Sequence, residues 1–349
     1  MAEDIHDRVV RGTYWWGVPT LLGAAHDPDP AACDVALVGV PHSTGNGTTE
    51  RDQHLGPRAV RHVSGLLGGR VHGPFGIDPW QVLRVHDLGD VLLPEGNDNE
   101  RCIARISKHF RTVDAAGARP VAIGGDHSIT GAILRAVAGE GAALTGGRPA
   151  GLLHIDAHTD TFDQLDHFMG ARDSAAHWAS YLVREGRVDP ARSVQIGLRG
   201  HTRSLDWLAP SRTLGYEVVT MARFREIGLE AACRLVRQRL GDGPIYITFD
   251  LDSLDPTVAP AVSNLEAGES GFSVDEAMAL LRAVRGLDVI GGDVVCLMPT
   301  KDSPNNITAM VASYLMFEML ALIAARAAGG AAAPTPGSAS AFGSASGSG

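Results

Sequence analysis

The 349-residue sequence predicts an α/β protein with one doubly wound, mainly parallel sheet of about eight strands. Short apolar or β-branched runs alternate with longer amphipathic stretches along nearly the whole chain. The runs are apolar on both faces, as expected for parallel strands that helices cover on each side. A hydrophobic content of 44% allows the substantial core that such a domain needs.

The strand predictions rest on eight runs, from DVALVGVP and VLRVHDLG to PIYITFDLD and VIGGDVVCLM. In chain order they span 34–41, 82–89, 119–126, 151–158, 193–200, 216–221, 244–252 and 289–298. Amphipathic patterns between them predict helices at 56–67, 99–116, 128–139, 175–186, 228–240 and 273–285. The most apolar run, 308–328, contains Glu318 and Arg326, which favours a buried C-terminal helix over a membrane span.

These patterns divide the chain into three predicted segments. Residues 1–33 are expected to form an N-terminal extension, and 34–328 a single catalytic domain. Residues 329–349 read GGAAAPTPGSASAFGSASGSG, which is too poor in large apolar residues to fold, so a disordered tail is expected.

Composition narrows the class of protein. The net charge is −10 and no basic cluster is present, which argues against a nucleic-acid partner. The four cysteines lie far apart without a CxxC pair, and no basic, then apolar, leader opens the chain. We therefore expect reduced thiols, a cytoplasmic location and no membrane association.

Aspartate and histidine residues are concentrated at the ends of three of the predicted strands. IGGDHS contains Asp126 and His127, HIDAHTD contains Asp156, His158 and Asp160, and FDLDSLD contains Asp250, Asp252 and Asp255. Ligands of open parallel sheets bind at the carboxyl ends of the strands. If the strand at 151–158 continues, the spacing of two directs Asp156, His158 and Asp160 to one side.

Several carboxylates cannot all stay ionised together in a partly dry cleft, and a divalent cation removes that difficulty. Two imidazoles and four carboxylates exceed the needs of one tetrahedral zinc and suit two oxygen-preferring metals that share carboxylates. Each motif alone has a simpler interpretation. Asp126 or Ser128 of IGGDHS could cap the next helix, DAHTD could be a structural acid cluster, and FDLDSLDP resembles a calcium loop.

Together the motifs GGDHS, DAHTD and DxDxxDPxxAP resemble the ureohydrolase family of arginases, agmatinases and related guanidino hydrolases, over about 34–325. The resemblance implies a three-layer α/β/α sandwich around eight parallel strands, assembled as a homotrimer or homohexamer. It implies two Mn²⁺ ions, with Ni²⁺ as an alternative, held at one position by His127, Asp156, Asp160 and Asp250 and at the other by Asp156, His158, Asp250 and Asp252. The implied reaction is hydrolysis of a small guanidino substrate, in which Asp160 passes a proton to the leaving amine.

A further histidine of this family follows DAHTD in a segment of the type HGxxF, where it serves proton transfer or substrate binding. Two residues fall in the right region, His167 and His177, and His177 is preferred because Tyr181 then matches the aromatic position. An ordinary core or surface histidine is the alternative for both.

The chain departs from the family at the carboxylate that binds the guanidinium group. DVVCLMP places Cys296 where the family has glutamate, and a thiol cannot form the two parallel charge-assisted hydrogen bonds that a carboxylate forms. AVSNLEAGESG, 261–271, replaces the family's GTGTPxxGG, so Asn264 and Glu266 are candidate substrate contacts or plain loop residues. Cys296 itself is expected to be a small buried side chain.

Two functions remain open at this level. The first is a binuclear metal amidinohydrolase acting on a guanidino acid, an agmatine-like amine or a substituted biguanide of the metformin type. The second is a non-catalytic subunit that stabilises an active paralogue in a hetero-oligomer, against which the complete set of six ligands argues.

Overall fold

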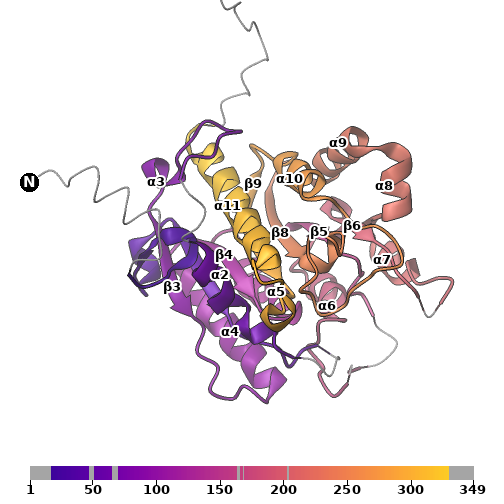
Figure 1. The fold of residues 1–349 in the computed structure, drawn as a ribbon, viewed down its shortest axis with the longest axis horizontal. Coiled ribbons are helices and arrows are strands. Elements are labelled where there is room, and N and C mark those ends of the chain that lie inside the picture. The colour runs from indigo at the N-terminus through magenta and orange to yellow at the C-terminus, as the bar shows by residue number, and fades with distance from the viewer. Residues whose placement is uncertain are drawn as a thin grey trace, which may run out of the picture.

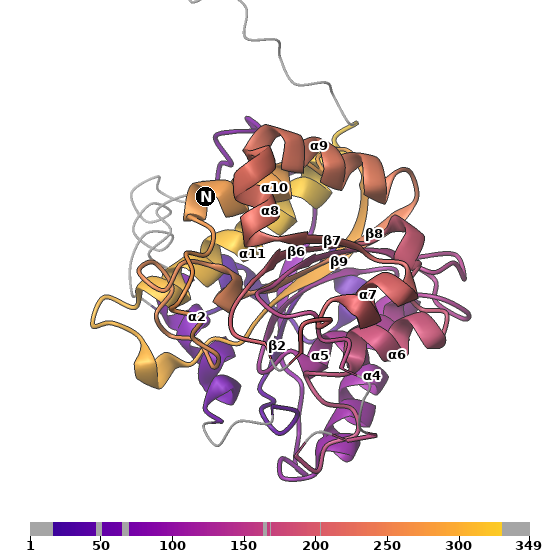
Figure 2. The ribbon, with the colours of Figure 1, turned by 90° about the vertical axis from the view of Figure 1, so that its right-hand side faces the viewer.

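A sheet of parallel strands crosses the molecule, with helices on both of its faces (Figures 1 and 2). The computed structural model describes residues 17–46, 51–64, 70–162, 166–167, 169–202 and 204–329. Its nine strands run in the order β1-β3-β2-β4-β9-β8-β5-β6-β7. They are β1 (Ala25–His26), β2 (Val35–Val40), β3 (Val85–Asp90), β4 (Arg119–Gly124), β5 (Gly151–Ile155), β6 (Val194–Leu198), β7 (Glu217–Thr220), β8 (Pro244–Asp250) and β9 (Asp288–Val295).

One face of the sheet is covered by helices from both ends of the chain. They are α2 (Gly56–Ser64), α3 (Pro79–Val82), α8 (Met221–Ile227), α9 (Leu229–Leu240), α10 (Val274–Arg282) and α11 (Ile307–Ala327). The opposite face carries α4 (Asn99–Ala115), α5 (Ser128–Val137), α6 (Trp178–Arg184) and α7 (Ala209–Leu214). Figure 2 shows the two layers separated by the sheet, which confirms the predicted sandwich.

All eight predicted strands are present, and the sheet gains a ninth at its edge. That strand, β1, lies inside the segment expected to be an extension, and it pairs with β3. Leu21, Leu22 and Ala24 of the same segment join the core, so residues 17–33 pack as part of the domain. A strand of two exposed residues carries no periodicity that a sequence pattern can reveal. Residues 1–16 and 330–349, from the expected extension and tail, lie outside the described residues.

Helix α11 is long and apolar enough to cross a membrane by length and composition. The fold buries 78% of its most apolar window inside the domain, which accounts for this composition without a membrane. Its Glu318 is also buried and accepts hydrogen bonds from Arg282 at 3.0 and 2.9 Å. Helix α11 is therefore a buried helix of the core, as the presence of Glu318 and Arg326 in its sequence predicted.

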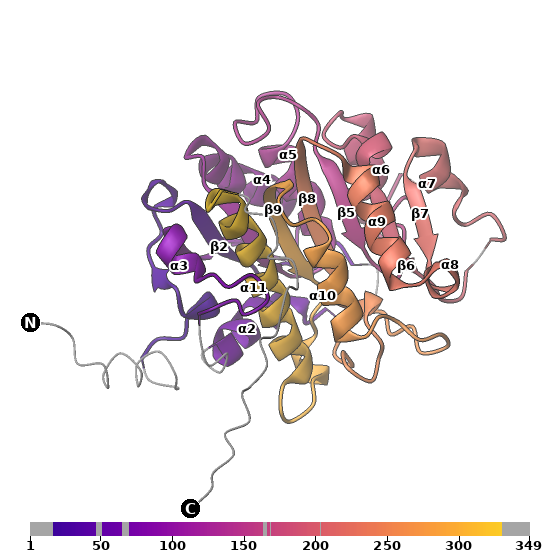
Figure 3. The same cartoon turned by 90° about the horizontal axis from the view of Figure 1, so that it is seen from above.

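The strand order brings the three charged motifs together. Strands β4, β8 and β5, which precede them, lie near the middle of the sheet, and only β9 separates β4 from β8. Figure 3 shows β9, β8 and β5 side by side. Because every described strand pairing is parallel, the carboxyl ends of these strands meet at the same edge. The segments after β4, β5 and β8 form the site described next.

Candidate metal centre

The turn after β4 places His127 at the start of α5. Asp126 does not contribute to the charged cluster, because its two oxygens accept bonds from the backbone N–H groups of Gly45, Asn46 and Ser128 at 2.8–3.0 Å. It therefore holds the neighbouring loop and the first turn of α5, as the simpler interpretation expected. Gly125 permits this turn, since a Cβ there would lie 1.9 Å from the carbonyl oxygen of His42.

The imidazole of His127 points one nitrogen into the cluster. Its Nδ1 lies 2.9 Å from Oδ2 of Asp156, 2.9 Å from Oδ2 of Asp160 and 3.1 Å from Oδ2 of Asp250. Nδ1 nevertheless has no hydrogen-bond partner within the described chain. Three carboxylate oxygens surround Nδ1, but its N–H bond would point at none of them with hydrogen-bond geometry. Such an arrangement is expected when the nitrogen and the oxygens share a cation.

The other nitrogen of His127 fixes the tautomer. Its Nε2 lies 2.9 Å from Oγ1 of Thr248, and that hydroxyl donates its proton to Asp293 Oδ1 at 2.6 Å. Thr248 must therefore accept a hydrogen bond from the Nε2–H of His127, so Nδ1 is the nitrogen that can release its proton and offer a lone pair to a metal ion. Such outer partners commonly orient metal-binding histidines. Neither Thr248 nor Asp293 was identified from the sequence.

The DAHTD segment converges on the cluster by a turn. Strand β5 ends at Ile155, so the expectation that strand alternation aligns Asp156, His158 and Asp160 is wrong. The chain leaves the sheet instead, and Asp160 takes a left-handed conformation with φ of 49°. The three side chains still meet at the site, because the turn redirects each one.

A second group of ligand atoms forms around His158. Its Nδ1 lies 3.1 Å from Oδ2 of Asp252 and 3.5 Å from Oδ1 of Asp156. Oδ2 of Asp252 is buried without a hydrogen-bond partner in the part of the chain described here. On its far side, Nε2 of His158 lies 3.3 Å from Oε1 of Glu266. His158 is 34% exposed, so this side of the site opens to solvent.

The segment after β8 supplies the remaining carboxylates. Oδ1 of Asp250 accepts the backbone N–H of Asp252 at 2.9 Å, which folds the short turn Leu251–Ser253. The buried guanidinium of Arg199 donates to the carbonyl oxygens of Asp252 and Leu254 at 2.7 and 3.0 Å. Asp255 is outside the site and caps its own turn through Thr257.

The electrostatics of the cluster favour an added cation. Burial lowers the pKa of His127, but the carboxylates of Asp160, Asp156 and Asp250 raise it well above its ordinary value. Burial and the charge of Asp250 raise the pKa of Asp252 well above that of a free carboxyl. By themselves, these groups balance their charges by retaining protons, and a divalent cation can replace such protons. The buried atoms without partners, His127 Nδ1 and Asp252 Oδ2, fit that role.

Cys296 lies at the end of β9 against the same cluster. It is buried and adopts a left-handed conformation with φ of 70°. Burial, together with the charges of Asp250 and Asp252, raises the pKa of its thiol well above the ordinary value. The position where the resemblance expects a carboxylate is therefore occupied by a neutral group.

The two candidate histidines differ sharply. His177 is buried at the start of α6, with its Nδ1 2.6 Å from Oγ of Ser174 and its ring stacked on Tyr181 at 5.5 Å. His167 is exposed, and no hydrogen bond or ion pair joins it to the six ligand side chains in the described chain. Asn264 is partly buried and likewise makes no such bond with them among the described residues.

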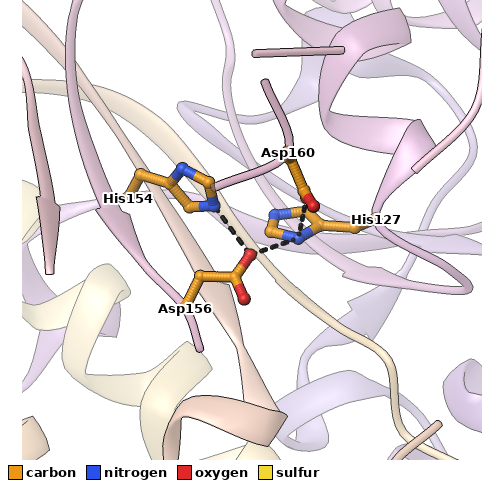
Figure 4. A group of neighbouring side chains, drawn as sticks. All are labelled: His127, His154, Asp156 and Asp160. Atoms are coloured by element: carbon orange, nitrogen blue, oxygen red, sulfur yellow. Dashed lines mark hydrogen bonds and ion pairs between the residues drawn. The ribbon is translucent and has the colours of Figure 1, made fainter. Parts of the chain in front are cut away.

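His154 and Trp178 also belong to the site, although the sequence patterns did not single them out (Figure 4 shows His154 with His127, Asp156 and Asp160). Gln195 donates to Nδ1 of His154 at 3.0 Å, so the protonated Nε2 donates to Oδ2 of Asp156 at 2.8 Å. His154 therefore orients Asp156. His154 lies on β5 two residues before Asp156, which directly follows the strand, and this spacing is a signal that could have identified it.

Comparisons with known proteins agree with this geometry. The model of the arginase family matches residues 33–321. The chain is 40% identical to a guanidinopropionase of Pseudomonas aeruginosa, over 89% of this chain and 93% of that protein. It is 38% identical to the human mitochondrial guanidino acid hydrolase, over 87% and 82% of the two chains. The crystal structure of a hypothetical agmatinase from Burkholderia thailandensis superposes with a TM-score of 0.79 at 34% identity, covering 90% and 92%.

Proposed function

Because this chain belongs to the arginase family, a family of hydrolases that act on C–N bonds of amidines, we propose that it is a binuclear metal amidinohydrolase. Its substrate would be a small guanidino compound, and water would replace the amine at the guanidino carbon. The proposed products from a simple alkylguanidine are urea and the free amine.

One observation carries the proposal. The two oxygens of Asp156 face different groups of ligand atoms: Oδ2 lies 2.9 Å from Nδ1 of His127, and Oδ1 lies 3.5 Å from Nδ1 of His158. A carboxylate between two imidazoles, with further carboxylates around each, is the arrangement that a shared bridging ligand requires. A structural acid cluster has no need for two imidazole nitrogens directed at the same carboxylate.

The first metal position would be held by His127, Asp156, Asp160 and Asp250, and the second by Asp156, His158, Asp250 and Asp252. Mn²⁺ is proposed, with Ni²⁺ as the alternative, because mixed oxygen and imidazole ligands suit both. When bound, a pair of divalent cations supplies a Lewis acid and an ionised water near neutral pH.

The remaining steps belong to the protein's own groups. Asp160 is proposed to accept a proton at Oδ1, because Oδ2 already accepts from Trp178 and faces His127, and to deliver it to the departing amine. His177 is proposed to relay a proton or to bind substrate, since it precedes Trp178, which contacts Asp160 directly. Glu266 would keep Nδ1 of His158 free for the metal, because it accepts from the opposite nitrogen of the ring.

The neutral side chain of Cys296 limits which guanidino compounds we propose as substrates. A neutral thiol cannot pair with a guanidinium cation, so a substrate that depends on that pairing would bind weakly. Guanidino acids, an agmatine-like amine bound by other groups, and delocalised biguanides of the metformin type are the proposed classes. Guanidinopropionase, the name of a 40% identical relative, supports the guanidino acid class.

The alternative function is a non-catalytic subunit that stabilises an active paralogue. Cys296 is the observation that favours it, because a carboxylate of the expected pocket is missing. The complete ligand set favours the catalytic function. We propose a cytoplasmic location and a homotrimer or homohexamer, with a hetero-oligomer under the alternative.

The deciding experiment measures metal content and turnover on one preparation. The purified chain, loaded with Mn²⁺ or Ni²⁺, is expected to retain about two ions per chain. It should release urea or an amine from agmatine, 3-guanidinopropionate, 4-guanidinobutyrate or dimethylbiguanide, and Asp252→Asn is the matched control. A chain that binds two ions but turns over none of these compounds would favour the non-catalytic subunit. A chain that binds no metal would contradict the proposal.

A further inference from the structure

Trp178, the first residue of α6, packs directly on the candidate metal ligands. Its side chain is 2% exposed, and its ring lies 4.9 Å from the rings of both His127 and His154. The contact is possible because Gly131 of α5 has no side chain: a Cβ there would lie 2.9 Å from the Cβ of Trp178. The indole therefore covers His127 in the cluster, whereas the side chain of His158 is 34% exposed.

The polar end of the same ring holds a ligand atom. Nε1–H of Trp178 donates to Oδ2 of Asp160 at 2.7 Å, and that oxygen lies 2.9 Å from Nδ1 of His127. The backbone N–H of the next residue, Ala179, donates to the carbonyl oxygen of Asp160 at 3.2 Å. Two consecutive residues of α6 thus fix both the backbone and the carboxylate of Asp160.

Asp160 needs such support. It leaves the sheet after β5 and has φ of 49°, a conformation that side-chain-bearing residues adopt at a cost. A carboxylate on an unsupported turn would sample several rotamers, and each one lost on metal binding weakens affinity. The indole N–H donor restricts Oδ2 to one position, with a lone pair left toward His127.

We propose that Trp178 is a positioning residue, which holds Asp160 in place as a donor to the first metal position. This inference rests on the proposed binuclear centre and adds an asymmetry to it. The first position is closed and organised by the indole, whereas the second is organised by Glu266 and opens to solvent. Loss of the indole N–H should weaken the first position and leave the second nearly unchanged.

The test is a metal titration of Trp178→Phe, which keeps an aromatic ring but removes the N–H donor. The matched control is Trp80→Phe, because Nε1 of Trp80 is buried and has no hydrogen-bond partner in the described structure. Titration calorimetry with Mn²⁺, and the visible absorption of the Co²⁺-loaded protein, report both positions without any substrate. Outer-shell partners of this kind contribute about 10- to 100-fold to metal affinity.

For Trp178→Phe we expect one of two binding phases to weaken by about 10- to 100-fold, with an altered Co²⁺ spectrum. Trp80→Phe should titrate like the wild type. Two unchanged phases in a folded Trp178→Phe protein would overturn the inference and leave the proposed function standing. A wild-type chain that binds no metal would overturn both.

A second variant covers the case in which Trp178→Phe does not fold. Gly131→Ala leaves Trp178 and every ligand intact but places a Cβ 2.9 Å from the Cβ of Trp178, which displaces the indole from Asp160. The same selective weakening is expected there. Wild-type affinity at both positions in Gly131→Ala, with the indole displaced, would refute the positioning role.

Discussion

Cys296→Glu tests whether the neutral residue at the end of β9 determines substrate preference. The wild-type thiol is kept neutral by burial and by the charges of Asp250 and Asp252. A glutamate at this position would place a third carboxylate beside them, in a backbone conformation that an unbranched side chain shares with cysteine. With both metal positions occupied, the added charge would be compensated and free to pair with a guanidinium cation.

The magnitude follows from the bond that is restored. A hydrogen bond to a charged group contributes about 1.5–3 kcal/mol, and about 1.4 kcal/mol corresponds to tenfold. Part of this gain is offset by repulsion from the neighbouring aspartates. We therefore expect kcat/KM for agmatine and 4-guanidinobutyrate to rise by about 10-fold or more, while dimethylbiguanide gains little.

The assay compares Cys296→Glu with Cys296→Gln, which has nearly the same size and no charge. Urea and amine release are followed on metal-loaded protein over a range of substrate concentrations, and thermal unfolding confirms that both variants fold. Equal effects of glutamate and glutamine on every substrate would refute the argument, because charge pairing distinguishes the two and pocket volume does not.

Other parts of the site and fold give three further predictions. Asp156→Asn should lower metal content at both positions and reduce turnover by more than about 100-fold, since even outer-shell partners contribute 10- to 100-fold; elemental analysis that finds only one position affected would contradict bridging. His177→Gln should reduce kcat by about 10²- to 10⁴-fold as a lost proton relay, whereas His167→Gln should stay within about twofold in the same assay. Asp87→Asn breaks a buried pair with Arg61 at 2.9 Å and should reduce the free energy of unfolding by about 3 kcal/mol at pH 7. Burial opposes ionisation, but Arg61 keeps the pKa of Asp87 below its usual range, so this stabilisation holds above about pH 4 and is lost as the pH falls. Urea unfolding that gives the same difference at pH 3 and pH 7 would contradict this.

Much of the site was predictable because its ligands follow strands. GGDHS, DAHTD and FDLDSLD each come directly after an apolar run, and the carboxyl ends of parallel strands share one edge of the sheet. The alternation of strands and helices, which predicts this shared edge, is local in the sequence. It pointed to eight charged residues after these strands, and the family resemblance narrowed them to six candidate ligands, His127, Asp156, His158, Asp160, Asp250 and Asp252.

Turns decide the part of the site geometry that sequence patterns do not predict. Strand β5 ends at Ile155, so alternation along a strand cannot explain how Asp160 reaches His127. The left-handed conformation of Asp160 and its bonds to α6 produce that approach. A two-residue edge strand in 17–33 was missed for a related reason, since periodicity needs more residues than β1 has.

By itself, then, the sequence determined the order of strands and helices and the charged residues that follow three of the strands. These are properties of residue type and spacing. The tertiary structure alone decided which groups orient the ligands: Thr248 and Asp293 behind His127, and Trp178 beside Asp160. His127 and Thr248 lie 121 residues apart in the chain and meet only through packing of the sheet and its helices, so no local pattern encodes their contact.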